Sequence, residues 1–521
     1  MLFNSFEFIF VFLPLTLCAY IYCARRWGNE AAIGILVLAS LFFYSYWNPA
    51  YLPLLLFSML FNFFVGRYLG VNKNKVVLTL GVITNLGVLG YYKYAGFFMA
   101  NMNAVFNNQW DLGLIILPLA ISFFTFQQIA YLVDSYQGIT KEYSFLHYSL
   151  FVSFFPQLIA GPIVHHKEML PQFESSKPYQ IDVNNLIVGL SIFSIGLFKK
   201  TVLADGIAVY ANPVFSAADT GQMLDFFYAW SGVLAYTLQL YFDFSGYSDM
   251  AIGLARIFGI VLPLNFYSPY KACNISEFWR RWHMTLSRFL RDYVYIPMGG
   301  NRKGPGRRYV NLVTTMLLGG LWHGAGWNFV IWGALHGAYL TIHQLWVSFL
   351  TLMGFKCSQT VPYKVFFWLV TFVAVVVGWV FFRATTLEGA LRLVEAMVGL
   401  QGISLPNALY ARMGEFGSTL QLLGIESNAR GGVDFVLVWL WIAALLPVVL
   451  MLPNTQDLFS RVKGSLSNLD HERKDALWPL FKLTGQLVWK ESRLWACLCA
   501  VALGLGLLTL TQVSEFLYFQ F

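Results

Sequence analysis

Charged side chains are scarce in this sequence, at 12% of its 521 residues, whereas 58% are hydrophobic and 18% are aromatic. Soluble domains contain about 25% charged residues on average, so an ordinary soluble protein is excluded. Many stretches instead supply the roughly 20 mostly apolar residues that a helix needs to cross a hydrocarbon core. We therefore predict an all-α, polytopic integral membrane protein.

Cysteine is also sparse, and its six copies lack the Cys-x-x-Cys spacing of a metal or redox site. Most of them lie in apolar runs, which predicts buried free thiols rather than disulfides. The sequence has no Gly-x-Ser-x-Gly elbow, phosphate-binding lysine loop or metalloprotease helix. We expect no metal site and no tightly bound cofactor.

No cationic leader precedes the first apolar stretch, residues 1–22, and Arg25 and Arg26 follow it. This order predicts a retained first span rather than a cleaved signal peptide. Because inner loops collect lysine and arginine, the N-terminus is predicted to lie outside. The next spans are expected to alternate consistently at residues 31–47, 51–69, 76–98 and 112–133.

The middle of the chain is less regular. Residues 145–163 are apolar but interrupted by Pro156, Gly161 and Pro162, which predicts a broken or re-entrant helix inside the protein or beside a cavity. Residues 277–297 are predicted to form an amphipathic helix at the cytoplasmic interface. In total we expect roughly 11–14 spanning or re-entrant helices.

Positive charge is concentrated between residues 271 and 308, where nine basic and two acidic residues account for +7 of the net charge of +8. In a membrane protein such a segment indicates a cytoplasmic loop. It could also attract anionic headgroups or an anionic donor molecule. We expect membrane lipids and no nucleic acid among the partners.

Two Trp-His pairs are the main candidates for chemistry. Trp282-His283 lies in the cationic segment, whereas Trp322-His323 lies in a stretch without formal charge between Tyr309 and Ile342. Ionisable groups at membrane depth usually face a cavity, a pathway or a substrate, so His323 could be a general base. The alternative is a histidine satisfied by a neighbouring helix. A turn near residues 325–328 would bring His336 towards His323.

Asp243 and Asp249 place two carboxylates in an aromatic segment. They could neutralise Arg280, Arg281 or Arg291, or they could line a polar tunnel. Structural ion pairing is the favoured interpretation.

A set of short motifs extends over most of the chain. The central ones are Tyr241-Phe242-Asp243-Phe244-Ser245-Gly246-Tyr247-Ser248-Asp249, Glu277-Phe278-Trp279-Arg280-Arg281-Trp282-His283, Gly299-Gly300-Asn301-Arg302 and Leu321-Trp322-His323-Gly324-Ala325. Others are Tyr92-Lys93-Tyr94, Leu117–Phe123, Phe155–Pro162 and the C-terminal Phe516-Leu517-Tyr518-Phe519-Gln520-Phe521. Together they resemble the membrane-bound O-acyltransferases, in particular the bacterial branch that O-acetylates exported polysaccharides.

The resemblance implies a helical bundle around a central funnel in the bacterial inner membrane. It implies one continuous domain over residues 1–521, with N-terminal spans (1–135), a catalytic core (140–385) and C-terminal spans with an aromatic tail (386–521). The catalytic histidine of the family matches His323. His283 matches a second recurrent histidine and is expected to support the reaction from the donor side, at a different depth from His323.

The expected reaction moves an acetyl group from a cytoplasmic thioester, acetyl-CoA by resemblance, towards an acceptor reached from the outer face. His323 is the expected base, and the glycine-rich backbone or Trp322 is a candidate donor to the oxyanion. Arg280, Arg281, Arg302 and Lys303 are the candidates for attracting the anionic donor. The expected partners are periplasmic polysaccharide acetyltransferase proteins. Alginate is the leading glycan, and cellulose or another exopolysaccharide is the alternative.

Two other functions remain open at this stage. The protein could transport acetyl groups without making or breaking a bond, or it could be a D-alanyl transfer protein of the teichoic acid type. The tail is also open to two interpretations: Tyr518 is either part of an interfacial aromatic anchor, which is favoured, or a transient acyl carrier outside the membrane.

Overall fold

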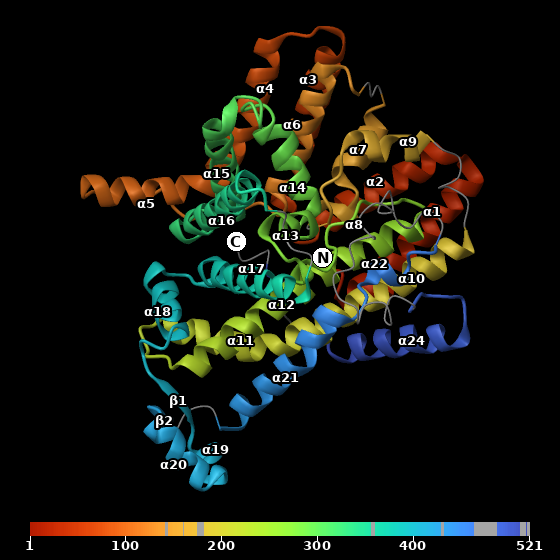
Figure 1. Ribbon diagram of the computed structural model, residues 1–521. Coiled ribbons are helices and arrows are strands. Elements are labelled where there is room, and N and C mark those ends of the chain that lie inside the picture. Colours follow the sequence, from red (N-terminus) through yellow and green to blue (C-terminus); the bar gives the residue numbers. More distant parts are fainter. Residues whose placement is uncertain are drawn as a thin grey trace.

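The structure, a computed structural model, describes residues 1–140, 144–159, 161–174, 182–355, 360–428, 432–462, 487–510 and 517. These residues are almost entirely helical (Figure 1). The exception is a small parallel sheet in which β1 (Ile403–Pro406) pairs with β2 (Ile425–Asn428). Within these described residues, six helices are long and apolar enough to cross a membrane. The predicted class of polytopic helical membrane protein is confirmed.

The N-terminal region contains the predicted early spans. Its elements are η1 (Glu7–Phe12), α1 (Leu13–Trp27), α2 (Asn29–Ser45), η2 (Pro49–Tyr51), α3 (Leu52–Val71), α4 (Lys75–Leu89), η3 (Gly90–Tyr94), α5 (Ala95–Phe106) and α6 (Ile121–Gln137). Helix α1 packs on α2, while α3 and α4 pack on α6. The π-helical segment η3 separates α4 from α5, which projects from the body of the molecule (Figure 1).

One predicted span begins later than expected. The helix expected at residues 112–133 starts at Ile121, after a non-helical stretch. Pro118 cannot donate a helical hydrogen bond and disfavours helical backbone at Leu117, and Ala120 adopts a left-handed conformation with φ 60°. The chain therefore enters α6 through irregular backbone, which lines the chamber described below.

The middle of the chain is broken as predicted, because α7 (Phe145–Ser153) ends before the short α8 (Phe155–Leu158), and α9 (His166–Glu174) follows. Then come α10 (Val183–Phe198), η4 (Lys199–Ala204), α11 (Asp205–Asp219) and α12 (Phe226–Ile257). Helix α12 is buried along most of its length and packs against both α10 and α11. It forms the centre of the bundle. His165 and His166, which flank the start of α9, are both buried.

The predicted amphipathic helix at residues 277–297 is wrong. The chain instead forms the 3₁₀ turn η5 (Pro269–Lys271), α13 (Ile275–Arg281), α14 (Met284–Leu290) and η6 (Arg291–Tyr295). The break falls at His283, whose φ of 42° is left-handed and cannot continue a helix. Because of this break, the apolar side chains of the segment turn into the bundle rather than lie along its surface.

Three long helices follow: α15 (Gly304–His323), α16 (Trp327–Leu352) and α17 (Val361–Arg383). Helices α15 and α16 cross closely at two glycines, Gly320 and Gly333. A Cβ atom added to Gly333 would lie 2.5 Å from the carbonyl oxygen of Met316, so only glycine allows this approach. The expected antiparallel turn after His323 is confirmed.

The remaining elements are a peripheral segment and the last helices of the chain. They are α18 (Leu387–Met397), β1, α19 (Asn407–Met413), α20 (Glu415–Leu422), β2, α21 (Gly432–Met451), α22 (Thr455–Leu458) and α24 (Arg493–Leu508). The sheet and α19–α20 lie at one end of the molecule, away from the helical body (Figure 1).

The two carboxylates of α12 are paired with lysines, not with the arginines considered above. The Lys200 Nζ lies 2.7 Å from both Asp205 Oδ1 and Asp243 Oδ1. The Lys199 Nζ lies 2.7 Å from Asp249 Oδ2. Because the π-helical segment η4 packs against α12, these lysines reach the carboxylates inside the bundle. Structural pairing is thus confirmed, and the expected arginine partners are wrong.

Candidate active site

His323 is the last residue of α15, and its side chain is only 4% exposed. Its ring centroid lies 5.0 Å from those of Trp332 and Phe382 and 4.9 Å from that of Trp322. These apolar rings exclude water from one side of the imidazole. In such surroundings hydrogen bonds and charges act more strongly than in water.

The other side of His323 faces a chamber of about 300 Å³. Its wall contains the irregular residues 117–120, the start of α6 and side chains from distant elements, including Trp47, Lys93, Ile159 and Trp322. A volume at the low end of small-molecule pockets fits a small acyl group and the group that accepts it. A whole polymer segment is too large for this space.

His283 lies beside His323 and not at a separate cytoplasmic entrance. The two ring centroids are 6.5 Å apart, and His283 is fully buried. The expectation of different depths is therefore wrong. Its physical cause is the left-handed break at His283, which directs the ring inward against Phe244 of α12, at a centroid distance of 4.8 Å.

The orientation of the His283 ring is set by Asn265. His283 Nδ1 lies 3.0 Å from the Asn265 Oδ1, which also accepts a hydrogen bond from the Thr285 hydroxyl at 2.9 Å. Because an amide oxygen only accepts, Nδ1 carries the proton in this arrangement. The Asn265 amide nitrogen in turn donates to Ser248 of α12 at 3.3 Å. Asn265 thus fixes the tautomer of the second histidine, a role that the sequence did not indicate.

His336 is separated from His323 by Trp332, whose ring centroid lies 4.7 Å from that of His336. The Trp279 indole donates to the His336 Nδ1 at 3.3 Å. The two histidines thus lie near each other, as predicted, with the Trp332 ring between them. His336 belongs to the aromatic wall of the site.

The four cations predicted to attract the donor lie on two elements: Arg280 and Arg281 end α13, and Arg302 and Lys303 precede α15. Arg281 forms an ion pair with Glu277 at 2.8 Å, and Arg280, Arg302 and Lys303 are exposed. Arg302 and Lys303 immediately precede α15, whereas His323 ends it. At 1.5 Å per residue, that helix separates them from His323 by about 30 Å. The structure brings together His323 and His283, whereas Arg302 and Lys303 lie at the opposite end of α15.

Lys93 is a site residue that we did not single out in the sequence. Its Nζ donates to the carbonyl oxygens of Trp322 at 2.6 Å and His323 at 3.2 Å. The neighbouring Tyr94 hydroxyl donates to Leu321 O at 2.7 Å. The available signal was a lone cation in an apolar span, which at membrane depth indicates function.

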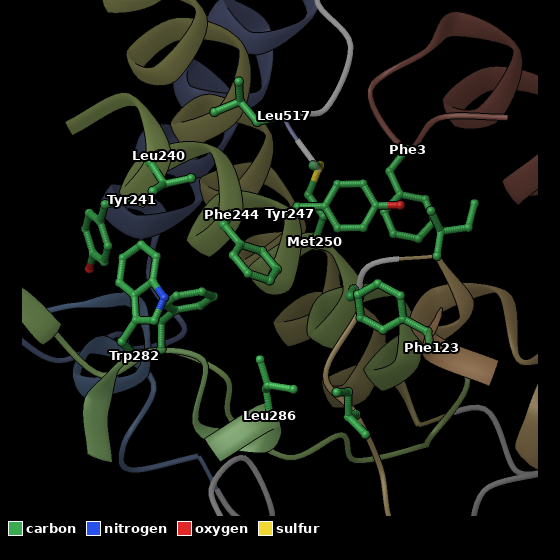
Figure 2. Close-up of a cluster of buried hydrophobic side chains, with 14 of the residues drawn as sticks. Phe3, Phe123, Leu240, Tyr241, Phe244, Tyr247, Met250, Trp282, Leu286 and Leu517 are labelled. Carbon is green, nitrogen blue, oxygen red and sulfur yellow. The ribbon is translucent and has the colours of Figure 1, made fainter. Parts of the chain in front are cut away.

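Leu517 contacts the central helix α12. Leu517 is 5% exposed, and its N–H donates to Asp243 Oδ2 at 3.2 Å. Figure 2 shows Leu517 near Leu240 of α12, in the cluster that also contains Phe244 and Trp282. Leu517 is therefore buried among the helices. Tyr518 lies outside the described residues.

The fold and site thus define a multi-pass helical membrane protein with two buried histidines beside a small chamber. Residues 134–379 match the family model described as MBOAT, membrane-bound O-acyltransferase family. The chain belongs to the membrane-bound O-acyltransferase family. It is an O-acyltransferase and a multi-pass protein of the bacterial inner membrane.

Two relatives cover most of the chain. This chain is 48% identical over 435 residues to the peptidoglycan O-acetyltransferase of Helicobacter pylori. The match covers 78% of this chain and 81% of the relative. The chain is 41% identical over 411 residues to the probable alginate O-acetylase AlgI of Pseudomonas aeruginosa, covering 76% and 75%. The teichoic acid D-alanyltransferase of Streptococcus thermophilus is 30% identical over 237 residues, covering 44% of this chain and 57% of the relative.

Proposed function

We propose that this protein transfers an acetyl group from a cytoplasmic thioester, acetyl-CoA, to an acceptor that enters the chamber from the outer face. The observation that carries the proposal is His323 at the chamber wall with His283 at a centroid distance of 6.5 Å. A neutral imidazole can take a proton from a hydroxyl and return it to a leaving thiolate. His323 is the proposed base, and His283 supports it.

The direction of transfer is inferred from the distribution of charge. The last turn of α1 carries Arg25 and Arg26, and the connection from α3 to α4 carries Lys73 and Lys75. Inner loops and helix ends collect such residues. The chamber is lined instead by residues 117–120 and Trp47, on segments that the alternation of spans places outside. Arg280, Arg302 and Lys303 are then on the donor side, where they can attract an anionic donor at the entrance without touching the acetyl group.

The acceptor glycan is proposed from the relatives. Alginate is the glycan expected from the sequence, and a relative named as an alginate O-acetylase supports it. Peptidoglycan is a second candidate, favoured by the 48% identity to a peptidoglycan O-acetyltransferase. In either case periplasmic acetyltransferase proteins are the proposed partners. Polymerase and epimerase genes beside this one would favour alginate.

The test is an assay of the purified full-length protein in proteoliposomes with acetyl-CoA. An acyltransferase releases free CoA thiol and loads acetyl onto the acceptor, whereas a transporter moves acetyl-CoA or acetate without releasing thiol. A D-alanyl transfer protein would require an aminoacyl thioester on a carrier protein. Absence of thiol release in the presence of acceptor would overturn the proposal.

We also propose that Tyr518 carries the acetyl group between two transfer steps. Its hydroxyl would accept the acetyl group and pass it to a periplasmic acetyltransferase. The neighbouring Leu517 is buried, and its N–H donates to Asp243 Oδ2. Tyr518→Phe removes only this hydroxyl, so glycan acetylation in cells should fall to background. Phe519→Tyr serves as a control for general disturbance of the tail. Full acetylation by Tyr518→Phe would leave the aromatic-anchor interpretation.

A further inference from the structure

The C-terminal end of α15 is held by two side chains from η3. Tyr94 donates to Leu321 O, and Lys93 donates to the next two carbonyl oxygens, those of Trp322 and His323. The last carbonyls of a helix have no partner within the helix, and a cation near this end interacts favourably with the helix dipole. Lys93 is thus fixed to the backbone of His323 itself.

A neutral side chain would satisfy the same carbonyl groups at lower cost. Lys93 is half-buried, and removing an ammonium group from water is less favourable than removing an amide or a hydroxyl. Tyr94 already shows that a neutral donor suffices at Leu321. Among the described residues, no carboxylate forms an ion pair with Lys93. The helix dipole and the Trp322 ring, whose centroid lies 6.0 Å from the Nζ, also favour a positive charge at this position.

The ammonium group has one more donor than the helix end uses. A lysine carries three N–H groups, and two of the acceptors are the carbonyl oxygens of Trp322 and His323. The Lys93 side chain also lines the chamber, together with His323. A charged donor is thereby held in the wall of the space where the acyl transfer is proposed to occur.

We propose that Lys93 is a catalytic residue whose third N–H stabilises the oxyanion of the tetrahedral intermediate. This inference rests on the proposed acetyl transfer. Charged donors form hydrogen bonds to oxyanions that are shorter and about twice as strong as neutral ones. Because Lys93 is bonded to the backbone of His323, the base and the oxyanion donor keep a fixed relative position.

The step balances without a further reactant. His323 takes the proton of the acceptor hydroxyl, whose oxygen attacks the carbonyl carbon of the acetyl thioester. A C–O bond forms, and the carbonyl electron pair moves onto the oxygen that faces Lys93. When the intermediate collapses, the C–S bond breaks, and the thiolate leaves with the proton held by His323.

The test compares Lys93→Met, Lys93→Gln and Tyr94→Phe in the full-length protein, purified in lipid nanodiscs and supplied with acetyl-CoA and acceptor. Lys93→Met removes charge and donors, whereas Lys93→Gln keeps an N–H donor for the helix end. Loss of one oxyanion donor should lower kcat by about 10²–10³-fold, with little change in KM for acetyl-CoA. Tyr94→Phe removes a neutral cap from the same turn and should lower kcat by less than about fivefold.

Three results would overturn the proposal: an unchanged kcat in both Lys93 variants, an equally large loss in Tyr94→Phe, or failure of both Lys93 variants to fold. The last result would identify Lys93 as a structural cap. Folding is followed by size-exclusion profile and thermal unfolding. If the wild-type protein releases no thiol, the proposed function fails; if the wild type is active and the Lys93 variants match it, only this inference fails.

Discussion

Replacement of His323 by alanine should abolish acetyl transfer while the protein remains folded. General-base catalysis contributes about 10²–10⁴-fold to a reaction rate, and the variant has no other group at this position to take the proton. His323 ends α15 instead of lying in its middle, so the helix does not depend on its side chain. The measurements are thiol release by the purified protein and glycan acetylation in cells that carry only the variant.

His147→Ala is the control, because it removes a histidine from a helix outside the site. His147 pairs with Glu30 at 3.1 Å and is not among the residues that line the chamber. This variant should retain wild-type activity. A folded His323→Ala protein that still acetylates its glycan would disprove the assignment of His323 as the base.

Lys200→Met should destabilise the protein severely. Lys200 is 1% exposed and bridges Asp205 and Asp243 at 2.7 Å each. Removal of one partner from a buried ionic group costs about 3–5 kcal/mol, because the remaining charge has no compensation. In this variant two carboxylates would face each other inside the bundle. The measurement is the midpoint of thermal unfolding in detergent, together with the yield of monodisperse protein.

Arg291→Met provides the comparison, since Arg291 pairs with Asp292 at 2.7 Å but is 61% exposed. Exposed ion pairs contribute about 0–1 kcal/mol, so this variant should unfold close to the wild-type temperature. Addition of Asp205→Asn and Asp243→Asn to Lys200→Met should recover much of the lost stability, because the charges are then removed together. Equal stability of Lys200→Met and the wild type would show that the buried group is not ionic.

The sequence was most informative where a pattern is local. The low charge predicted the membrane class, and the interruptions near Pro156 predicted the broken α7–α8 region. The charge-free surroundings of His323 indicated a site, which the structure places beside a chamber. These features depend on composition or on neighbours within a few residues.

The predictions that were wrong concern residues whose positions depend on contacts between segments far apart in the sequence. The inward position of His283 depends on a single left-handed residue and on packing against Phe244, which is 39 positions earlier by residue number. The pairing of Lys200 with Asp243 depends on the contact between η4 and α12. The role of Lys93 depends on a contact with the end of α15, 229 residues away. Local periodicity contains no information on such contacts.

The close crossing of α15 and α16 also limits how the site can move. At Gly320 and Gly333 the two backbones touch without intervening side chains, so the helices cannot slide or rotate independently without a steric clash. His323 and Trp332 are therefore carried on one rigid unit, and Lys93 is attached to its end. Phe382 of α17 also lies against the imidazole but does not belong to this unit. An acetyl donor that approaches His323 through the aromatic rings must therefore displace Phe382. The hinge for substrate entry is thus expected in α17, not in the hairpin that carries the catalytic histidine.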